Sequence, residues 1–298
     1  MMRLKPLLFF IVTLLFAQGH LAAQSFSCPS NIDFELGNLS NWNLYTGSCC
    51  PISTPTPGAV SGRHTITSCT ATDFYGGFPV ISPAVGFYSM KLGNASTNSE
   101  AERARYYIRI PANANNYSVF YRYAVVFQDP NHTPAQQPRF EVSAFDSATG
   151  TPIPCTVRSY VASSSLPGFT QSTVDATVWY LPWTISSLNL SGSAGKTIAV
   201  DFASGDCALG GHFGYGYIDI SCGLFSISNQ ECNLGGNTTL SAPPGFRLYT
   251  WMDSSFTTTI ATGQTVSIPT PSVTTKYKLI LTPYQGFGCA DTLTSVIT

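Results

Sequence analysis

Hydrophobic and polar residues alternate along much of this chain, and the alternation predicts β-strands. The clearest case is the stretch 103–110, where apolar or aromatic residues occupy every second position and arginine or tyrosine stands between them. Side chains of a strand point to opposite faces with a period of two, so this stretch should have one buried and one wet face. The stretch 213–222 repeats the pattern, with Ile218 and Ile220 on one face and Asp219 on the other.

Strand-like stretches follow one another closely through the first three quarters of the chain. They cover residues 87–92, 101–110, 117–127, 138–145, 178–190, 196–203 and 213–222. Seven or more strands at this spacing are typical of a β-sandwich. The stretch 117–127 is apolar on both faces, so we expect it at the centre of a sheet. A short strand is also expected at 33–35, with Phe34 inward and Asp33 and Glu35 on the other face.

The character of the sequence changes near residues 224–229, and a second unit is expected from 224 to 298. It contains Cys232, Trp251 and Cys289 in that order, with strand-like stretches at 238–241, 248–252, 264–268 and 276–282. A Cys, Trp, Cys order among short strands suggests an immunoglobulin-like sandwich with Trp251 in its core. The pattern therefore predicts a Cys232–Cys289 disulfide, and residues 24–223 form the first domain.

The first 23 residues read as a secretory signal peptide. Two basic residues, Arg3 and Lys5, precede an apolar run of about 11 residues, and Ala22 and Ala23 follow it. That run is too short to cross a bilayer, which needs roughly 20 apolar residues. We expect cleavage after Ala23 and a secreted or surface-held mature chain that does not insert into the membrane.

Composition agrees with a secreted all-β protein and excludes some partners. Of 298 residues, 44% are hydrophobic and only 10% are charged, with a formal net charge of -1. A chain without a basic surface has no electrostatic attraction for nucleic acid. Gly, Pro and aromatic residues are plentiful, which favours strands and turns over helices.

All nine cysteines follow residue 23, where an exported chain would meet an oxidising compartment. Disulfides are therefore expected, and the odd number leaves at least one thiol unpaired. Residues 46–86 are rich in Pro, Gly, Ser and Thr, which suggests a long loop with little regular structure. A bond from Cys49 or Cys50 to Cys69 is a plausible staple for it.

Sequence blocks at both ends of the first domain resemble known families. Phe34-Glu35 near the start and Ile218-Asp219 near the end resemble the jelly-roll family that includes MAM domains and several carbohydrate-binding modules. A more extensive similarity, to the N-terminal module of large secreted surface proteins of Bacteroidota, rests on PGAVSGRH (57–64), ERARY (102–106), YRYAVVFQDPNHTPAQQPRFEV (121–142) and GDCALGGHFGYGYID (205–219).

The second unit resembles the PKD-like or Ig-like repeats of the same proteins, through TTLSAPPGFRLYTW (238–251) and YKLILTPYQGFGCADTL (277–293). Those proteins often end in a gliding-motility-associated, type IX secretion C-terminal domain. No such domain is recognised in this chain. The resemblance implies a cell-surface location and adhesion, and it supplies no activity.

Three acids are candidates for a calcium site. The first and last strands of a jelly roll are commonly neighbours, which would bring Asp33, Glu35 and Asp219 together. Calcium takes six to eight oxygen ligands, and carbonyls of the Gly37 turn could complete the shell. In the families resembled, the positions matching Glu35 and Asp219 serve a structural calcium. Solvated or salt-bridged acids are the main alternative, and a glycosidase pair is a weaker one.

Four aromatic residues are candidates for a sugar-binding platform: Trp179, Trp183, Tyr121 and Tyr123. A flat ring covers the C–H face of a pyranose at low entropic cost. Core packing explains aromatic residues equally well, and Trp42 and Trp251 are assigned to cores.

The histidines of the mature chain, His64, His132 and His212, each lie in one of the family-like blocks. A three-histidine zinc site is conceivable, but no HExxH spacing supports it, and hydrogen bonding in loops is the plainer interpretation. Ser61 lacks a GxSxG elbow, so no nucleophile is evident. The stretch 205–212, with Asp206, Cys207 and the candidate ligand-binding residue His212, is where we expect any site beyond calcium.

The sequence thus favours a non-catalytic, secreted cell-surface or adhesion protein with a structural calcium. The alternative is a carbohydrate-binding module of a polysaccharide-degrading system. The expected partners are an extracellular glycan or another surface protein.

Overall fold

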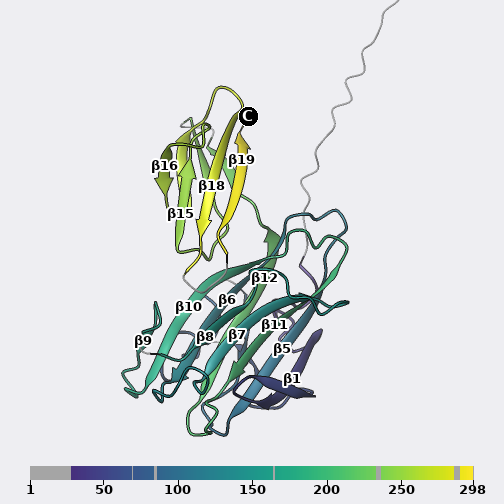
Figure 1. The fold of residues 1–298 in the computed structure, drawn as a ribbon, viewed down its shortest axis with the longest axis vertical. Coiled ribbons are helices and arrows are strands. Elements are labelled where there is room, and N and C mark those ends of the chain that lie inside the picture. The colour runs from purple at the N-terminus through teal and green to yellow at the C-terminus, as the bar shows by residue number, and fades with distance from the viewer. Residues whose placement is uncertain are drawn as a thin grey trace, which may run out of the picture.

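The computed structural model describes residues 28–68, 70–83, 86–163, 165–232, 236–284 and 289–297. All regular structure in these residues is β-strand, arranged as a larger sandwich and a smaller one (Figure 1). In this part of the chain no helix has the length and hydropathy to span a bilayer. The predicted signal peptide lies outside the described residues.

Two antiparallel six-stranded sheets form the first domain. Sheet A contains, in spatial order, β2 (Ser53–Pro57), β1 (Trp42–Ser48), β5 (Glu100–Arg109), β11 (Thr197–Gly205), β7 (Arg139–Asp146) and β8 (Arg158–Val161). Sheet B contains β3 (His64–Ser68), β4 (Tyr88–Leu92), β12 (Gly214–Leu224), β6 (Tyr117–Gln128), β10 (Val178–Asn189) and β9 (Thr170–Gln171). From β4 to β7 and from β10 to β12, successive strands alternate between the sheets, as is typical of jelly rolls.

The seven predicted strands of this domain are confirmed, because each stands within a few residues of its expected range. The predicted strand at 33–35 is wrong, since these residues form turns and Phe34 has a φ of 63°. The Asn31 side chain holds the turns by donating to the Asn38 and Ser40 carbonyls and accepting from Leu36 N. The loop expected at 46–86 also contains the short strands β2 and β3.

Strand β6 is buried on both faces, as predicted for a central strand. Its inner face, with Tyr121 and Tyr123, joins the core between the sheets. Its outer face, with Ala124 and Val126, joins a second apolar cluster that includes Phe78 and other residues of the segment 75–81. That segment therefore covers part of the outer face of sheet B.

Strand β12 has the same two-sided burial. Ile218 and Ile220 pack in the core between the sheets, as the alternation predicts. Tyr215 and Tyr217 lie in the outer cluster, and their hydroxyls donate to Asp73 Oδ2 at 2.8 and 2.9 Å. The polar face of the predicted strand is therefore covered by protein.

The arginines of β5 are paired with an acid on the neighbouring strand. Arg105 Nε lies 2.6 Å from Asp201 Oδ1, and Arg103 also bonds this carboxylate. Asp201 is buried, so two guanidinium groups neutralise one desolvated charge. The face predicted to be wet is therefore organised by ion pairs.

The second domain packs two small sheets around Trp251. One contains β13 (Ser228–Cys232), β14 (Asn237–Ser241) and β17 (Thr265–Pro269), and the other contains β16 (Thr259–Thr262), β15 (Leu248–Met252), β18 (Thr275–Thr282) and β19 (Asp291–Ile297). Trp251 is fully buried and donates from Nε1 to Gly263 O at 2.9 Å. Its assignment to a core is confirmed, and an Ig-like or PKD-like family for this domain stays a prediction.

Among the described residues, three disulfides join Cys28 to Cys222, Cys49 to Cys50 and Cys155 to Cys289. The predicted Cys232–Cys289 pair is therefore wrong. Cys289 lies two residues before Asp291, the first residue of β19. Asp291 accepts a hydrogen bond from Asn189 of sheet B, so this end of the domain faces the first sandwich. The predicted staple from Cys49 or Cys50 to Cys69 is also replaced, by the bond between the neighbours; Cys69 itself lies outside the described residues.

Candidate functional site

The predicted aromatic platform is not present, because its four members lie in different environments. Tyr121 and Tyr123 are 0% and 4% exposed in the core. Trp179 is half-buried and lies opposite the core residue Phe127 on the neighbouring strand β6. Trp183 packs instead on Tyr217 in the outer cluster and donates from Nε1 to Pro79 O at 2.7 Å. An irregularity of β10 between Leu181 and Thr184 separates the two tryptophans.

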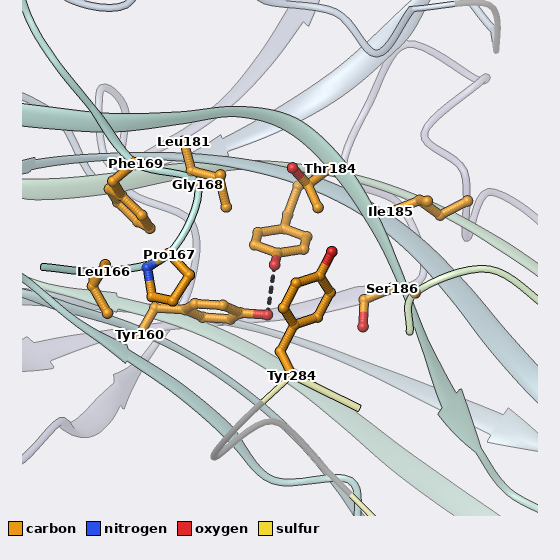
Figure 2. Close-up of a pocket in the computed structure, with 12 residues that line it drawn as sticks. Tyr160, Leu166, Pro167, Gly168, Phe169, Leu181, Thr184, Ile185, Ser186 and Tyr284 are labelled. Atoms are coloured by element: carbon orange, nitrogen blue, oxygen red, sulfur yellow. Dashed lines mark hydrogen bonds between the residues drawn. The ribbon is translucent and has the colours of Figure 1, made fainter. Parts of the chain in front are cut away.

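A different aromatic site, which we call the tyrosine pocket, lies beside β8 and β10 and is completed by the second domain (Figure 2). Its cavity has a volume of about 170 Å³. The lining residues are Tyr123, Tyr160, Leu166, Pro167, Gly168, Phe169, Leu181, Thr184, Ile185, Ser186, Gly245 and Tyr284. Four of the twelve lining residues are aromatic and five carry a hydroxyl group, and no lining residue carries a charge.

The tyrosines at the base of the pocket are held in fixed positions. Tyr123 Oη donates to Tyr160 Oη at 2.6 Å, and their ring centroids are 5.0 Å apart. Burial raises the pKa of both phenols, so both stay neutral at physiological pH. A neutral phenol can donate and accept hydrogen bonds, which suits a polar, uncharged ligand.

The second domain supplies Tyr284 and Gly245 and is fixed against the first at this place. Figure 2 shows Tyr160 and Tyr284 projecting into the same space. A Cβ at Gly245 would lie only 2.7 Å from Ser186 Cα, so glycine allows the two backbones to meet. The Cys155–Cys289 disulfide and the Asn189–Asp291 hydrogen bond, 2.8 Å long, secure the same contact.

Two of the three predicted calcium ligands are neighbours. Burial raises the pKa of Asp219 to about 7, and the charge of Glu35 adds to this effect. The Asp219 Oδ2 atom is buried without a hydrogen-bond partner. Glu35 accepts from the backbone N–H groups of Phe87 and Tyr88 at 3.0 and 3.2 Å.

The third predicted calcium ligand does not join them. Asp33 Oδ1 accepts from Glu35 N at 3.3 Å within the turn. Within the described ranges, the one group of three or more close metal-ligating side chains is His132, Cys207 and His212. The expectation that three carboxylates meet is therefore wrong, because residues 33–35 form a turn and not a strand beside β12.

The histidines separate into one isolated residue and one pair. His64 is buried in β3, accepts from Val60 N at Nδ1, and has a pKa lowered by burial. His132 and His212 lie edge to face, with ring centroids 5.3 Å apart. Burial and the charge of His132 lower the pKa of His212. Cys207 is a free, buried thiol beside this pair.

Of the residues that line the tyrosine pocket, the sequence predicted only Tyr123 as a sugar-binding candidate. The lining residues come from β6, β8, β10, the 166–169 loop and the second domain, and no local sequence pattern relates these distant segments to one another. Sequence reasoning did single out Cys207 and His212 as unexplained, and the structure adds His132 to them.

No family model and no curated protein matches this chain. Among solved structures, it is similar to TmCBM61 in complex with β-1,4-galactotriose, with 12% identity, a TM-score of 0.39, and coverage of 67% of this chain and 99% of that one. It is also similar to the family 11 carbohydrate-binding module of the cellulase Lic26A-Cel5E of Clostridium thermocellum, with 9% identity, a TM-score of 0.28, and coverage of 62% and 89%. A third is the enzymatically active domain of bacteriophage CBA120 tailspike protein 4, with 13% identity, a TM-score of 0.36, and coverage of 66% and 21%.

Proposed function

We propose that this chain is a secreted, non-catalytic carbohydrate-binding protein whose glycan site is the tyrosine pocket. The observation that carries the proposal is a cavity lined by four aromatic rings and five hydroxyl groups, with no charged side chain. Rings stack on the apolar face of a sugar, and hydroxyls bind its polar rim. The three disulfides and the predicted signal peptide support secretion to an oxidising compartment.

The size and charge of the pocket limit the ligand. A cavity of about 150 Å³ can hold one benzene ring, so the 170 Å³ of this pocket suits one six-membered ring. A buried carboxylate would need a cationic partner, which the lining does not offer. The pocket is therefore suited to one neutral pyranose at the end of a chain, such as a terminal hexose of an extracellular polysaccharide or a surface glycoprotein.

Binding of the full chain to a glycan array should show a preference for oligosaccharides with neutral terminal sugars. Tyr284→Ala should weaken binding of the preferred glycan about ten-fold in isothermal titration, since a stacked ring contributes on the order of 1 kcal/mol beyond its buried area. Tyr107→Ala is the matched control, because Tyr107 is 41% exposed and Tyr284 44% exposed, and Tyr107 lies outside the pocket. Equal affinities of the two variants would contradict the assignment of the site.

We also propose that Glu35 and Asp219 hold a structural calcium ion. The unpartnered, buried Asp219 Oδ2 atom near the Glu35 carboxylate supports this, because a cation there would stabilise the charged form of the desolvated Asp219 carboxyl group. Calcium would tie the turn at 33–37 to β12. Neither Glu35 nor Asp219 lines the tyrosine pocket, so the two proposed sites are separate.

Removal of divalent ions with EDTA should therefore lower the melting temperature, and added Ca²⁺ should raise it again. Asp219→Asn should abolish the response to Ca²⁺, since one charged ligand is lost. Asp33→Asn should retain it, because Asp33 bonds within its own turn. A melting temperature that is unchanged in excess EDTA would refute the calcium site.

A further inference from the structure

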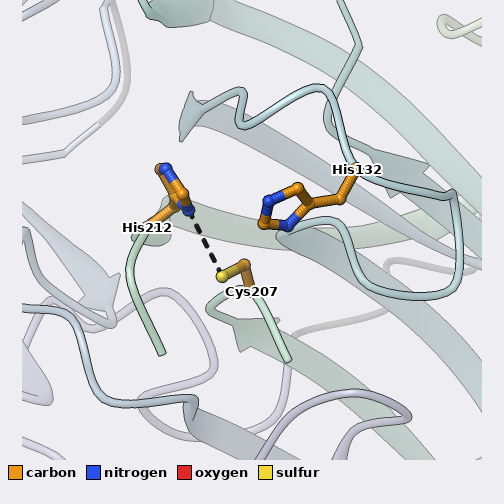
Figure 3. Close-up of side chains that lie close together, drawn as sticks. All are labelled: His132, Cys207 and His212. Carbon is orange, nitrogen blue, oxygen red and sulfur yellow. Dashed lines mark hydrogen bonds between the residues drawn. The ribbon is translucent and has the colours of Figure 1, made fainter. Parts of the chain in front are cut away.

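Two loops at one end of the first sandwich bring together three side chains with metal-binding atoms. His132 lies in the loop between β6 and β7, and Cys207 and His212 lie in the loop between β11 and β12 (Figure 3). One ligand atom from each residue lies within 4.8 Å of the other two. None of these residues lines the tyrosine pocket.

The spacing of these atoms fits a tetrahedral ion. Zinc binds sulfur at about 2.3 Å and imidazole nitrogen at about 2.0–2.1 Å, which places the two ligand atoms about 3.5 Å apart in a tetrahedral site. Cys207 Sγ lies 3.4 Å from His212 Nδ1. The pair therefore needs little movement to hold an ion.

Backbone hydrogen bonds fix the loops that carry the ligands. Cys207 N donates to His212 O at 3.0 Å, which closes the β11–β12 loop on itself. Ala208 N donates to Gln136 O at 3.0 Å, which joins this loop to the one that carries His132. The Asp206 carboxylate accepts from Glu100 N and Gly214 N on either side. These hydrogen bonds hold the two loops, and therefore the three ligand side chains, in place relative to the strands of the sandwich.

A hydrogen-bonded Cys–His pair does not account for the whole cluster. Contact with His212 would satisfy the Cys207 thiol, but the His132 Nδ1 atom is buried without a partner. A nucleophilic role is also poorly supported, because Cys207 is 0% exposed and a substrate could not reach its sulfur. An ion, in contrast, can enter beside the partly exposed imidazoles.

We propose that His132, Cys207 and His212 bind a zinc ion. A thiolate and two neutral imidazoles are the donors that zinc takes in proteins, and three protein ligands leave a fourth position for water or another ligand. Binding would release the thiol proton to solvent and would link the β6–β7 loop to the β11–β12 loop.

The purified full chain, reduced mildly and stripped of metal, tests this proposal in buffer with excess Ca²⁺, which keeps any calcium site filled. One equivalent of Zn²⁺ should bind in competition with a chromophoric chelator. Co²⁺ should give the visible bands of a tetrahedral ion and a near-ultraviolet thiolate-to-cobalt band, which a site without cysteine cannot produce.

Cys207→Ser, His132→Ala and His212→Ala should each weaken Zn²⁺ binding about 100-fold or more, beyond the roughly 10–100-fold cost of losing an outer-shell partner. His64→Gln is the matched histidine control and should bind as the unaltered protein does. If the variants fold poorly, the Co²⁺ spectrum of the unaltered protein decides the matter. Absence of the thiolate band, or equal Zn²⁺ affinity in Cys207→Ser, would overturn the proposal.

Discussion

Replacing both Cys28 and Cys222 with serine should destabilise the first sandwich by about 5 kcal/mol in the chain-entropy description of disulfides. The bond joins residues 194 positions apart and ties the start of the described chain to the central strand β12. The segment it anchors has no strand before Trp42, yet it supplies Phe34, which stacks on Trp42 with ring centroids 4.9 Å apart. Without the bond, this segment should separate from the core at lower denaturant.

Urea unfolding followed by tryptophan fluorescence measures this effect. The double variant Cys49→Ser/Cys50→Ser is the control, because its bond joins neighbouring residues and closes no long loop. This control variant should be destabilised by only about 1–2 kcal/mol, because serine hydroxyls replace the packed sulfur atoms. If both double variants lose the same free energy of unfolding, the length of the loop closed by the Cys28–Cys222 bond does not contribute to stability, and the prediction is contradicted.

Trp251→Ala should destabilise the second domain by about 3–5 kcal/mol, the usual cost of truncating a large buried ring. The side chain is fully buried at the centre of a small core and also loses its hydrogen bond to Gly263 O. A domain of this size has little stability to spare. We therefore expect it to unfold well below the first domain in calorimetry.

The same substitution should weaken glycan binding, because the second domain contributes Gly245 and Tyr284 to the tyrosine pocket. Val273→Ala is the control, since Val273 is 71% exposed in the same domain and its loss leaves the core intact. If Trp251→Ala unfolds the second domain but leaves glycan affinity unchanged, Tyr284 has no part in the site.

Much of the first sandwich could be predicted because its signal is local. The alternation in β5 and β12 and the two-sided apolar character of β6 are each readable within a dozen residues. The turn at 33–37 could not be predicted in this way, because it depends on the side-chain hydrogen bonds of Asn31, which periodicity does not reveal. The alternation in β12 places Asp219 on the face opposite the two isoleucines, but it does not reveal that the distant segment 75–81 packs on that face of the strand.

The sites were harder to predict because they depend on contacts between distant residues. The Cys155–Cys289 bond crosses between domains, and a search within one domain favours Cys232 as the partner. Tyr160 and Tyr284 meet only because that bond and the close approach at Gly245 fix the second domain beside β8 and β10. His132 lies on a different loop from Cys207 and His212, far from them in the sequence, so no short motif relates the three residues.

A crystal structure of the full chain with the oligosaccharide preferred on the array would test the central proposal most directly. We predict one neutral terminal pyranose in the tyrosine pocket, in contact with the rings of Tyr160 and Tyr284. A glycan bound over the outer face of either sheet, with the pocket empty of sugar, would contradict the proposed function as we assign it.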